Sequence, residues 1–77
     1  MYEFRRQRIT ALRDRLGMTR EEMAERLGKK KQQISIWESG VNKPTLDNLL
    51  DLCNTFDTAP TFFFTEVSTT VEERRGK

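Results

Sequence analysis

The chain has 77 residues, with 14 Lys and Arg, 12 Asp and Glu, one Cys, no His and a formal net charge of +2. A chain of this length makes one small domain, near the lower size at which an apolar core suffices without disulfides or a metal. One cysteine excludes an internal disulfide, and the lack of histidine removes most metal sites and the usual general base. We therefore expect a protein that is not an enzyme and has no metal site and no cofactor.

The charge is distributed unevenly along the chain. Residues 1–43 contain eleven Lys and Arg against six Asp and Glu, whereas residues 44–77 contain three against six. A basic half is the electrostatic footprint expected of a protein that binds a polyanion. No apolar run approaches transmembrane length, and the N-terminus lacks the apolar stretch of a signal peptide, so a cytoplasmic protein with no membrane partner is expected.

Residues 4–16 are predicted to form the first helix. Ile9, Leu12 and Leu16 fall on one stripe at helical spacing, which makes Ile9 and Leu12 candidates for the core. Gly17 ends the helix.

Residues 19–40 form two short amphipathic segments joined by a tight turn. Thr19, followed three residues later by Glu22, has the pattern of a capping box at the start of the first segment. Gly28 lies between the segments, and only glycine adopts positive φ without steric cost. Trp37 points inward by its spacing. This arrangement predicts a helix-turn-helix.

The outer face of the second segment has residue types that suit a DNA groove. Three lysines at 29–31 precede Gln32 and Gln33, and Ile36 lies one turn further on. Glutamine matches the N6 and N7 edge of adenine, lysine donates to guanine or to phosphate, and isoleucine packs on a thymine methyl group. The same residues also occur on solvated helix faces, so this pattern alone leaves both interpretations open.

The chain contains several different short motifs at characteristic spacing: Leu12-Arg13, Leu16-Gly17-Met18-Thr19, Met23-Ala24, Leu27-Gly28, Ile34-Ser35, Trp37-Glu38-Ser39-Gly40, Lys43-Pro44 and Leu49-Leu50. With these motifs the sequence resembles the phage-repressor and Cro-like helix-turn-helix domains, the XRE family, over roughly residues 5–64. The resemblance implies an all-α fold, a compact five-helix bundle of the lambda-repressor-like type, which binds operator DNA as a dimer.

The resemblance also assigns roles to individual residues. The family residues that face base edges correspond to Lys31, Gln32, Gln33 and Ile36. Contacts to backbone phosphates are expected from Asn42 and Lys43, and also from Arg20, which stands where the family often has glutamine. A partly buried ion pair between Arg13 and Glu38 is expected to tie the first helix to the end of the recognition helix, in a structural role.

Lys29 and Lys30 depart from the family pattern, which has a Ser or Thr cap at the start of the recognition helix. The missing cap costs about 1 kcal/mol, and the positive end of the helix dipole faces lysines. A phosphate bound there would offset both penalties, so Lys29 and Lys30 are predicted phosphate contacts.

A fourth helix is predicted after the Thr45 cap, followed by a short fifth helix over 61–64. The apolar face expected for the fourth helix consists of Leu46, Leu49, Leu50, Leu52, Cys53 and Phe56. Three consecutive phenylalanines cannot all face one core from a helix. By correspondence with the family, Phe63 faces inward and Phe62 and Phe64 form a dimer contact.

We therefore expect a helix-turn-helix domain over residues 1–64 and a C-terminal tail over 65–77, either disordered or forming an added strand at a dimer interface. The expected function is sequence-specific binding of duplex DNA by a transcriptional repressor that occupies a two-fold symmetric operator as a homodimer. Two alternatives stay open: an antitoxin that uses its tail or an acidic face to bind a toxin, and a protein-interaction module that has lost DNA binding.

Overall fold

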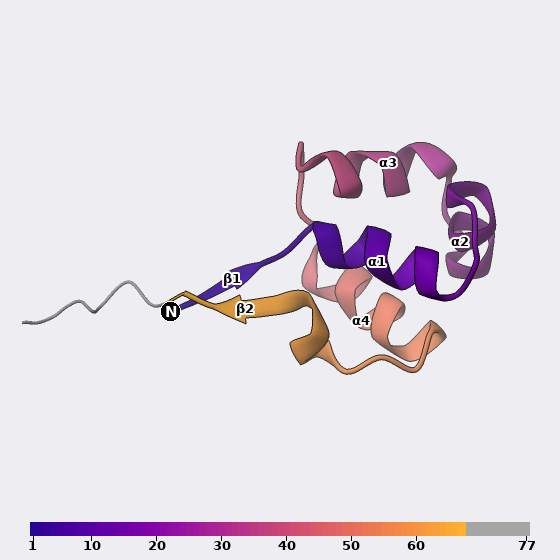
Figure 1. Cartoon of the computed structure of the whole chain (residues 1–77). Coiled ribbons are helices and arrows are strands. Elements are labelled where there is room, and N and C mark those ends of the chain that lie inside the picture. The colour runs from indigo at the N-terminus through magenta and orange to yellow at the C-terminus, as the bar shows by residue number, and fades with distance from the viewer. Residues whose placement is uncertain (68–77) are drawn as a thin grey trace, which may run out of the picture.

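The computed structural model describes residues 1–67, so most of the predicted tail, residues 68–77, lies outside the described residues. The elements in chain order are β1 (Tyr2–Phe4), α1 (Gln7–Arg15), α2 (Arg20–Leu27), α3 (Lys31–Ser39), α4 (Leu46–Thr55), the 3-10 helix η1 (Pro60–Phe63) and β2 (Phe64–Glu66) (Figure 1). Within residues 1–67, no helix combines the length and the apolar character needed to cross a membrane.

The helices enclose a single apolar core, with α1 lying between α3 and α4 (Figure 1). The core residues are Ile9, Leu12, Met23, Ala24, Ile34, Trp37, Leu49, Leu52, Cys53 and Phe63. Ile9, Leu12 and Trp37, which the sequence predicts to face inward, are buried, and so is Cys53. Full burial of a Leu, Ile or Phe side chain stabilises the fold by about 1.5–3 kcal/mol.

The apolar face predicted for α4 is partly wrong. Leu49, Leu52 and Cys53 are buried, but Leu46 and Leu50 are 70% and 42% exposed. Residues four apart lie one above the other on a helix, so Leu46 and Leu50 share a stripe that faces away from the core. The face with Leu49, Leu52 and Cys53 meets the rest of the molecule, and Phe56 is half-buried against the same core.

Local signals determine both ends of α2. The Thr19 hydroxyl accepts from the backbone N–H of Glu22 at 3.1 Å, and the Glu22 carboxylate accepts from the N–H of Thr19 at 2.8 Å, which completes the predicted capping box. Gly28 ends the helix with φ +71°, in the left-handed region. The chain then turns at once, and Lys29 donates its N–H to the carbonyl of Ala24 at 2.8 Å.

The prediction of an all-α bundle of five helices is correct for four α-helices, but the structure also has two short strands, and the fifth helix is not an α-helix. Tyr2–Phe4, predicted in part as the start of the first helix, is strand β1. It pairs antiparallel with β2 in the register Tyr2 to Glu66 and Phe4 to Phe64. The expected fifth helix is the single 3-10 turn η1, after which the chain enters β2.

Aromatic packing gives the physical reason for this ribbon. Phe63 at the end of η1 is fully buried, and its ring stacks on Phe4 with centroids 6.5 Å apart. Phe64 follows in extended backbone and meets the edge of Phe4 at 5.9 Å. The ribbon projects from the helices and crosses the expected boundary between residues 64 and 65 (Figure 1). The partner strand of β2 is thus the N-terminus of its own chain.

Candidate nucleic-acid interface

The pair α2 and α3, joined at Gly28, forms the predicted helix-turn-helix. Ile34 and Trp37 anchor α3 to the core, which leaves its opposite side accessible. Lys31 and Gln32 are exposed and Gln33 is half-buried. Ile36 is also half-buried because it packs against the core, so less of its side chain reaches the surface than the sequence indicated.

The start of α3 is uncapped, as the sequence predicts. Lys30 occupies the N-cap position in extended conformation, without a capping hydrogen bond from its side chain, and the first turn has no acidic residue. Free N–H groups and the helix dipole make such an end favourable for an anion. Lys31 meets Glu21 of α2 at 3.4 Å, but both side chains are about half exposed or more, so solvent screens this pair and it contributes little to stability.

The structure brings Arg13 and Glu38 together in a two-pronged ion pair between α1 and α3. Arg13 Nε donates to Glu38 Oε2 at 2.9 Å, and Arg13 Nη2 donates to Oε1 at 3.3 Å. The third nitrogen, Nη1, donates to the carbonyl of Met18 at 3.0 Å. The Glu38 side chain is only 3% exposed, so this pair is screened little by solvent.

Two further arginines contact Glu38, and sequence reasoning missed both. Arg20, the first residue of α2, donates from Nε to Glu38 Oε1 at 2.9 Å. Arg6 donates from Nη1 to the carbonyl oxygen of Glu38 at 2.8 Å. We call Arg6, Arg13, Arg20 and Glu38 the arginine clamp. It holds the C-terminal end of α3, where the helix dipole also favours positive charge.

No sequence signal indicated these two contacts. Arg20 lies 18 residues and Arg6 lies 32 residues from Glu38, and spacing rules describe only neighbours within one element. Arg20 was expected to contact a phosphate. The structure places its Nε on Glu38 and leaves 47% of its side chain exposed.

The clamp determines the protonation of Glu38. Burial on its own raises the pKa of this carboxyl group, but the hydrogen bonds and charges of Arg13 and Arg20 together outweigh burial. The pKa of Glu38 is therefore lowered from its ordinary value of 4.5. The same hydrogen bonds raise the pKa of Arg13, despite some loss of solvation.

The lowered pKa of Glu38 makes the stability of the fold depend on pH. Because the pKa of Glu38 is lower in the folded chain, its ionised form stabilises the fold at all pH values above 4.5, and this contribution is lost as the pH falls through the folded pKa. Urea unfolding of the native chain and of Glu38→Gln should show a constant difference in unfolding free energy near neutral pH and a shrinking one below pH 4.5. A difference that stays constant down to about pH 3 would contradict the shift.

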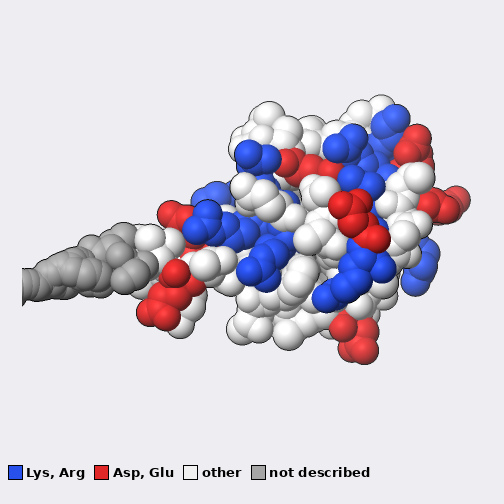
Figure 2. All heavy atoms as spheres, in the orientation of Figure 1, with Lys and Arg blue, Asp and Glu red and all other residues white. Residues whose placement is uncertain are grey.

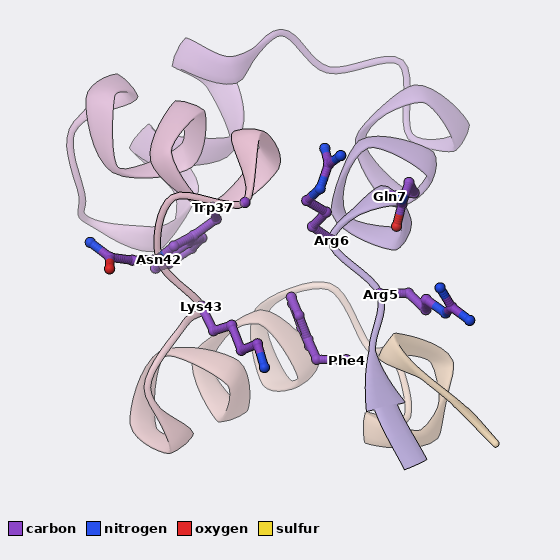
Figure 3. Close-up of a pocket in the computed structure, with 8 residues that line it drawn as sticks. Phe4, Arg5, Arg6, Gln7, Trp37, Asn42 and Lys43 are labelled. Carbon is purple, nitrogen blue, oxygen red and sulfur yellow. The ribbon is translucent and has the colours of Figure 1, made fainter. Parts of the chain in front are cut away.

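The remaining predicted phosphate contacts surround α3. Lys29 is half-buried and Lys30 exposed at its start, while Asn42 and Lys43 are exposed in the loop between α3 and α4. Figure 3 shows Lys43 and Asn42 on this loop, across a hollow from Arg6. Lys and Arg atoms recur across the face shown in Figure 2, with acidic atoms among them.

The two phenylalanines predicted for a dimer contact have different surroundings. Phe62 is half-buried against its own chain, with the guanidinium carbons of Arg8 and Arg15 at 5.2 and 5.1 Å from its ring centroid. Phe64 is 36% exposed. It lines a shallow apolar hollow of about 390 Å³ with Tyr2 and Thr61.

Among residues 1–67, no three side chains of the types His, Cys, Asp and Glu are grouped so that they could hold a metal ion. A protein-family model described as Helix-turn-helix matches residues 9–63. Comparisons with curated proteins and with solved structures found no match. The family model covers well over half of the chain, from α1 to the end of η1, and the matched region contains the uncapped, basic start of α3. The chain therefore belongs to the XRE (Cro/C1-type) helix-turn-helix family of DNA-binding domains.

Proposed function

We propose that the protein is a transcriptional repressor that binds a specific duplex DNA sequence as a homodimer. The observation that carries this proposal is the outer side of α3, where Lys31, Gln32 and Gln33 are accessible beside an uncapped, basic helix start. A recognition helix of this kind enters the major groove with its N-terminal residues on the base edges.

In this proposal the side chains of α3 make different kinds of contact with the DNA. Gln32 and Gln33 read base edges by paired donor and acceptor contacts, with about 1–3 kcal/mol of discrimination for each good contact. Lys31 exchanges its weak surface pair with Glu21 for a base or a phosphate. Ile36 contributes an apolar contact through the part of its side chain that the core leaves accessible.

The proposed phosphate contacts are Arg20, Lys29, Lys30, Asn42 and Lys43. Lys29 and Lys30 flank the free N–H groups of α3, so a phosphate there would also bind to the helix end. Arg20 donates only from Nε to Glu38, which leaves its two terminal nitrogens out of that hydrogen bond, and 47% of its side chain is exposed. They can donate to a phosphate while the clamp fixes the plane of the guanidinium group.

The homodimer is proposed to form through the apolar hollow beside Phe64. Replacing Phe64 by Thr should raise the dissociation constant of the dimer by at least about fivefold, because a central aromatic side chain at an interface is worth more than about 1 kcal/mol. Sedimentation velocity at tens of micromolar measures this. Val41→Thr removes an apolar side chain that is 71% exposed elsewhere on the surface and should leave the association unchanged. A native chain that is monomeric with and without DNA would contradict the dimer.

Selection of bound sequences from a random duplex library tests the function directly. At near-physiological salt, non-specific phosphate binding is weak enough for specific sites to be enriched. We expect a two-fold symmetric motif whose half-sites lie about one helical turn, 34–36 Å, apart. Recovery of no enriched motif would contradict sequence-specific binding, and an enriched motif without symmetry would contradict the dimeric operator.

A further inference from the structure

A second basic feature lies beside the recognition helix, at the other end from Lys29 and Lys30. It is a hollow of about 210 Å³ between the start of α1 and the loop that joins α3 to α4 (Figure 3). Its lining residues are Phe4, Arg5, Arg6, Gln7, Trp37, Gly40, Asn42 and Lys43. We call it the α1 hollow. Only Asn42 and Lys43 of this set belong to the contacts proposed above.

The lining is cationic and contains no acidic residue. Arg6 and Lys43 approach from two different segments, the start of α1 and the α3–α4 loop (Figure 3). Arg5 points away from the hollow in Figure 3 and meets Glu3 at 3.4 Å, so its charge is largely offset. Gln7 and Asn42 also line the hollow and have uncharged donors, although the Asn42 side chain points away from Arg6 and Lys43 in Figure 3. Cations from two segments at one hollow match the chemistry of an oxyanion.

The backbone at the start of α1 adds to the positive electrostatic potential in the α1 hollow. Helix α1 begins at Gln7 without a side-chain cap and without an acidic residue in its first turn. Its positive dipole end therefore adds to the charges of Arg6 and Lys43. The aromatic side chains of Phe4 and Trp37 form an apolar part of the wall, which strengthens electrostatic attraction by lowering the local dielectric constant.

Arg6 is held in place before any ligand arrives. Its Nη1 donates to the carbonyl of Glu38, and its Cδ lies 2.7 Å from the position that a Cβ on Gly40 would occupy. A side chain at position 40 would thus collide with Arg6, and glycine, with φ +84°, leaves the required space. Fixing a long side chain in advance reduces the entropy that binding must offset.

We propose that the α1 hollow binds a phosphate group of the DNA backbone, next to the C-terminal end of α3. This inference rests on the proposed DNA-binding function and extends its contact surface from the helix-turn-helix to the start of α1. DNA is the favoured source of the phosphate because the hollow adjoins the end of the recognition helix and shares Asn42 and Lys43 with the proposed backbone contacts. A free phosphate compound is the other source of the same chemistry.

Gln7→Glu separates binding from folding. The substitution changes one amide to a carboxylate at the first residue of α1, where the helix dipole favours negative charge, so the fold should be as stable as before or more so. Asn54→Asp on α4 is the matched control, because it makes the same change of charge at an exposed site on the other side of α1 from α3. Thermal unfolding of both variants verifies the fold.

Binding is measured by fluorescence anisotropy with a 20-base-pair duplex over a range of salt concentrations. At about 0.1 M salt we expect Gln7→Glu to raise the Kd five- to tenfold more than Asn54→Asp does, and to reduce the slope of log K against log salt by about one. Lys43→Gln should lower the slope similarly. Equal Kd values for Gln7→Glu and Asn54→Asp would overturn the inference while leaving the proposed function intact.

Backbone amide spectra identify the source of the phosphate. Addition of the duplex should shift the N–H signal of Gln7 and the side-chain NH₂ signals of Asn42, and Lys43→Gln should reduce both shifts. Inorganic phosphate at constant ionic strength is the comparison probe. If it shifts these signals and the duplex does not, the assignment to DNA is overturned. If the native chain binds no duplex with salt-dependent affinity, the proposed DNA-binding function itself is contradicted, and the inference about the α1 hollow is overturned with it.

Discussion

Replacing Glu38 by alanine is expected to lower the free energy of unfolding by about 3–5 kcal/mol, since it removes the shared partner of a buried ion pair. Arg13 loses two of its three hydrogen bonds, and its side chain, only 15% exposed, keeps its charge with only the exposed carboxylate of Asp14 nearby, at 4.0 Å. Arg20 loses its Nε partner at the same time. Loss of this size would use up much of the stability of a 77-residue domain.

Urea unfolding followed by the fluorescence of Trp37 measures this effect, because Trp37 lies in the core next to Glu38 in the chain. If Glu38→Ala is unfolded without urea, Glu38→Gln retains the shape of the side chain and yields a measurable value. The control is Asp14→Ala: Asp14 also lies near Arg13, at 4.0 Å, but is 69% exposed. We expect the control to change stability by less than about 0.5 kcal/mol. A loss below about 1 kcal/mol for Glu38→Ala would contradict a structural role for the clamp.

The double variant Gln32→Ala/Gln33→Ala is expected to weaken binding to the selected DNA sequence by about 2–6 kcal/mol, if each glutamine makes one good base contact. Binding to unrelated duplex should hardly change, because that binding depends on contacts between positively charged side chains and phosphates, and glutamine is uncharged. The specificity ratio should therefore fall by nearly the same factor as the specific affinity.

Anisotropy titrations against the selected duplex and a scrambled duplex of equal length measure both quantities. Alanine has the higher helix propensity and Gln32 is exposed, so the variant should fold as well as the native chain. Asn54→Ala, on α4, is the control for a polar truncation outside the proposed interface. Equal weakening on both duplexes would contradict base readout and would indicate a general loss of contact or of fold.

The helix-turn-helix was predictable from the sequence because its determinants are local. The Thr19 capping box, the left-handed Gly28 and the inward stripe containing Trp37 depend on residues within one or two helical turns. The uncapped start of α3 beside Lys30 was equally visible. These features depend on short-range backbone geometry, which spacing rules describe well.

The ribbon and most of the clamp were not predictable in this way. Tyr2–Phe4 and Phe64–Glu66 lie at opposite ends of the described chain, and neither has a strand pattern strong enough to name its partner. Their pairing follows from burial of Phe63 against Phe4, which exists only after the helices have packed. On α4, packing likewise selected one of two apolar stripes.

The sequence by itself thus determined the helix-turn-helix, its basic start and the polar side chains of α3, because each depends on neighbours in the chain. The tertiary structure decided the partners of Glu38, the α1 hollow and the β1–β2 ribbon. Each of these joins segments that are far apart in sequence, and their contacts depend on how the core brings those segments together. For Arg20, the position at the start of α2 was evident from the sequence, whereas the hydrogen bond to Glu38 was decided by the tertiary structure.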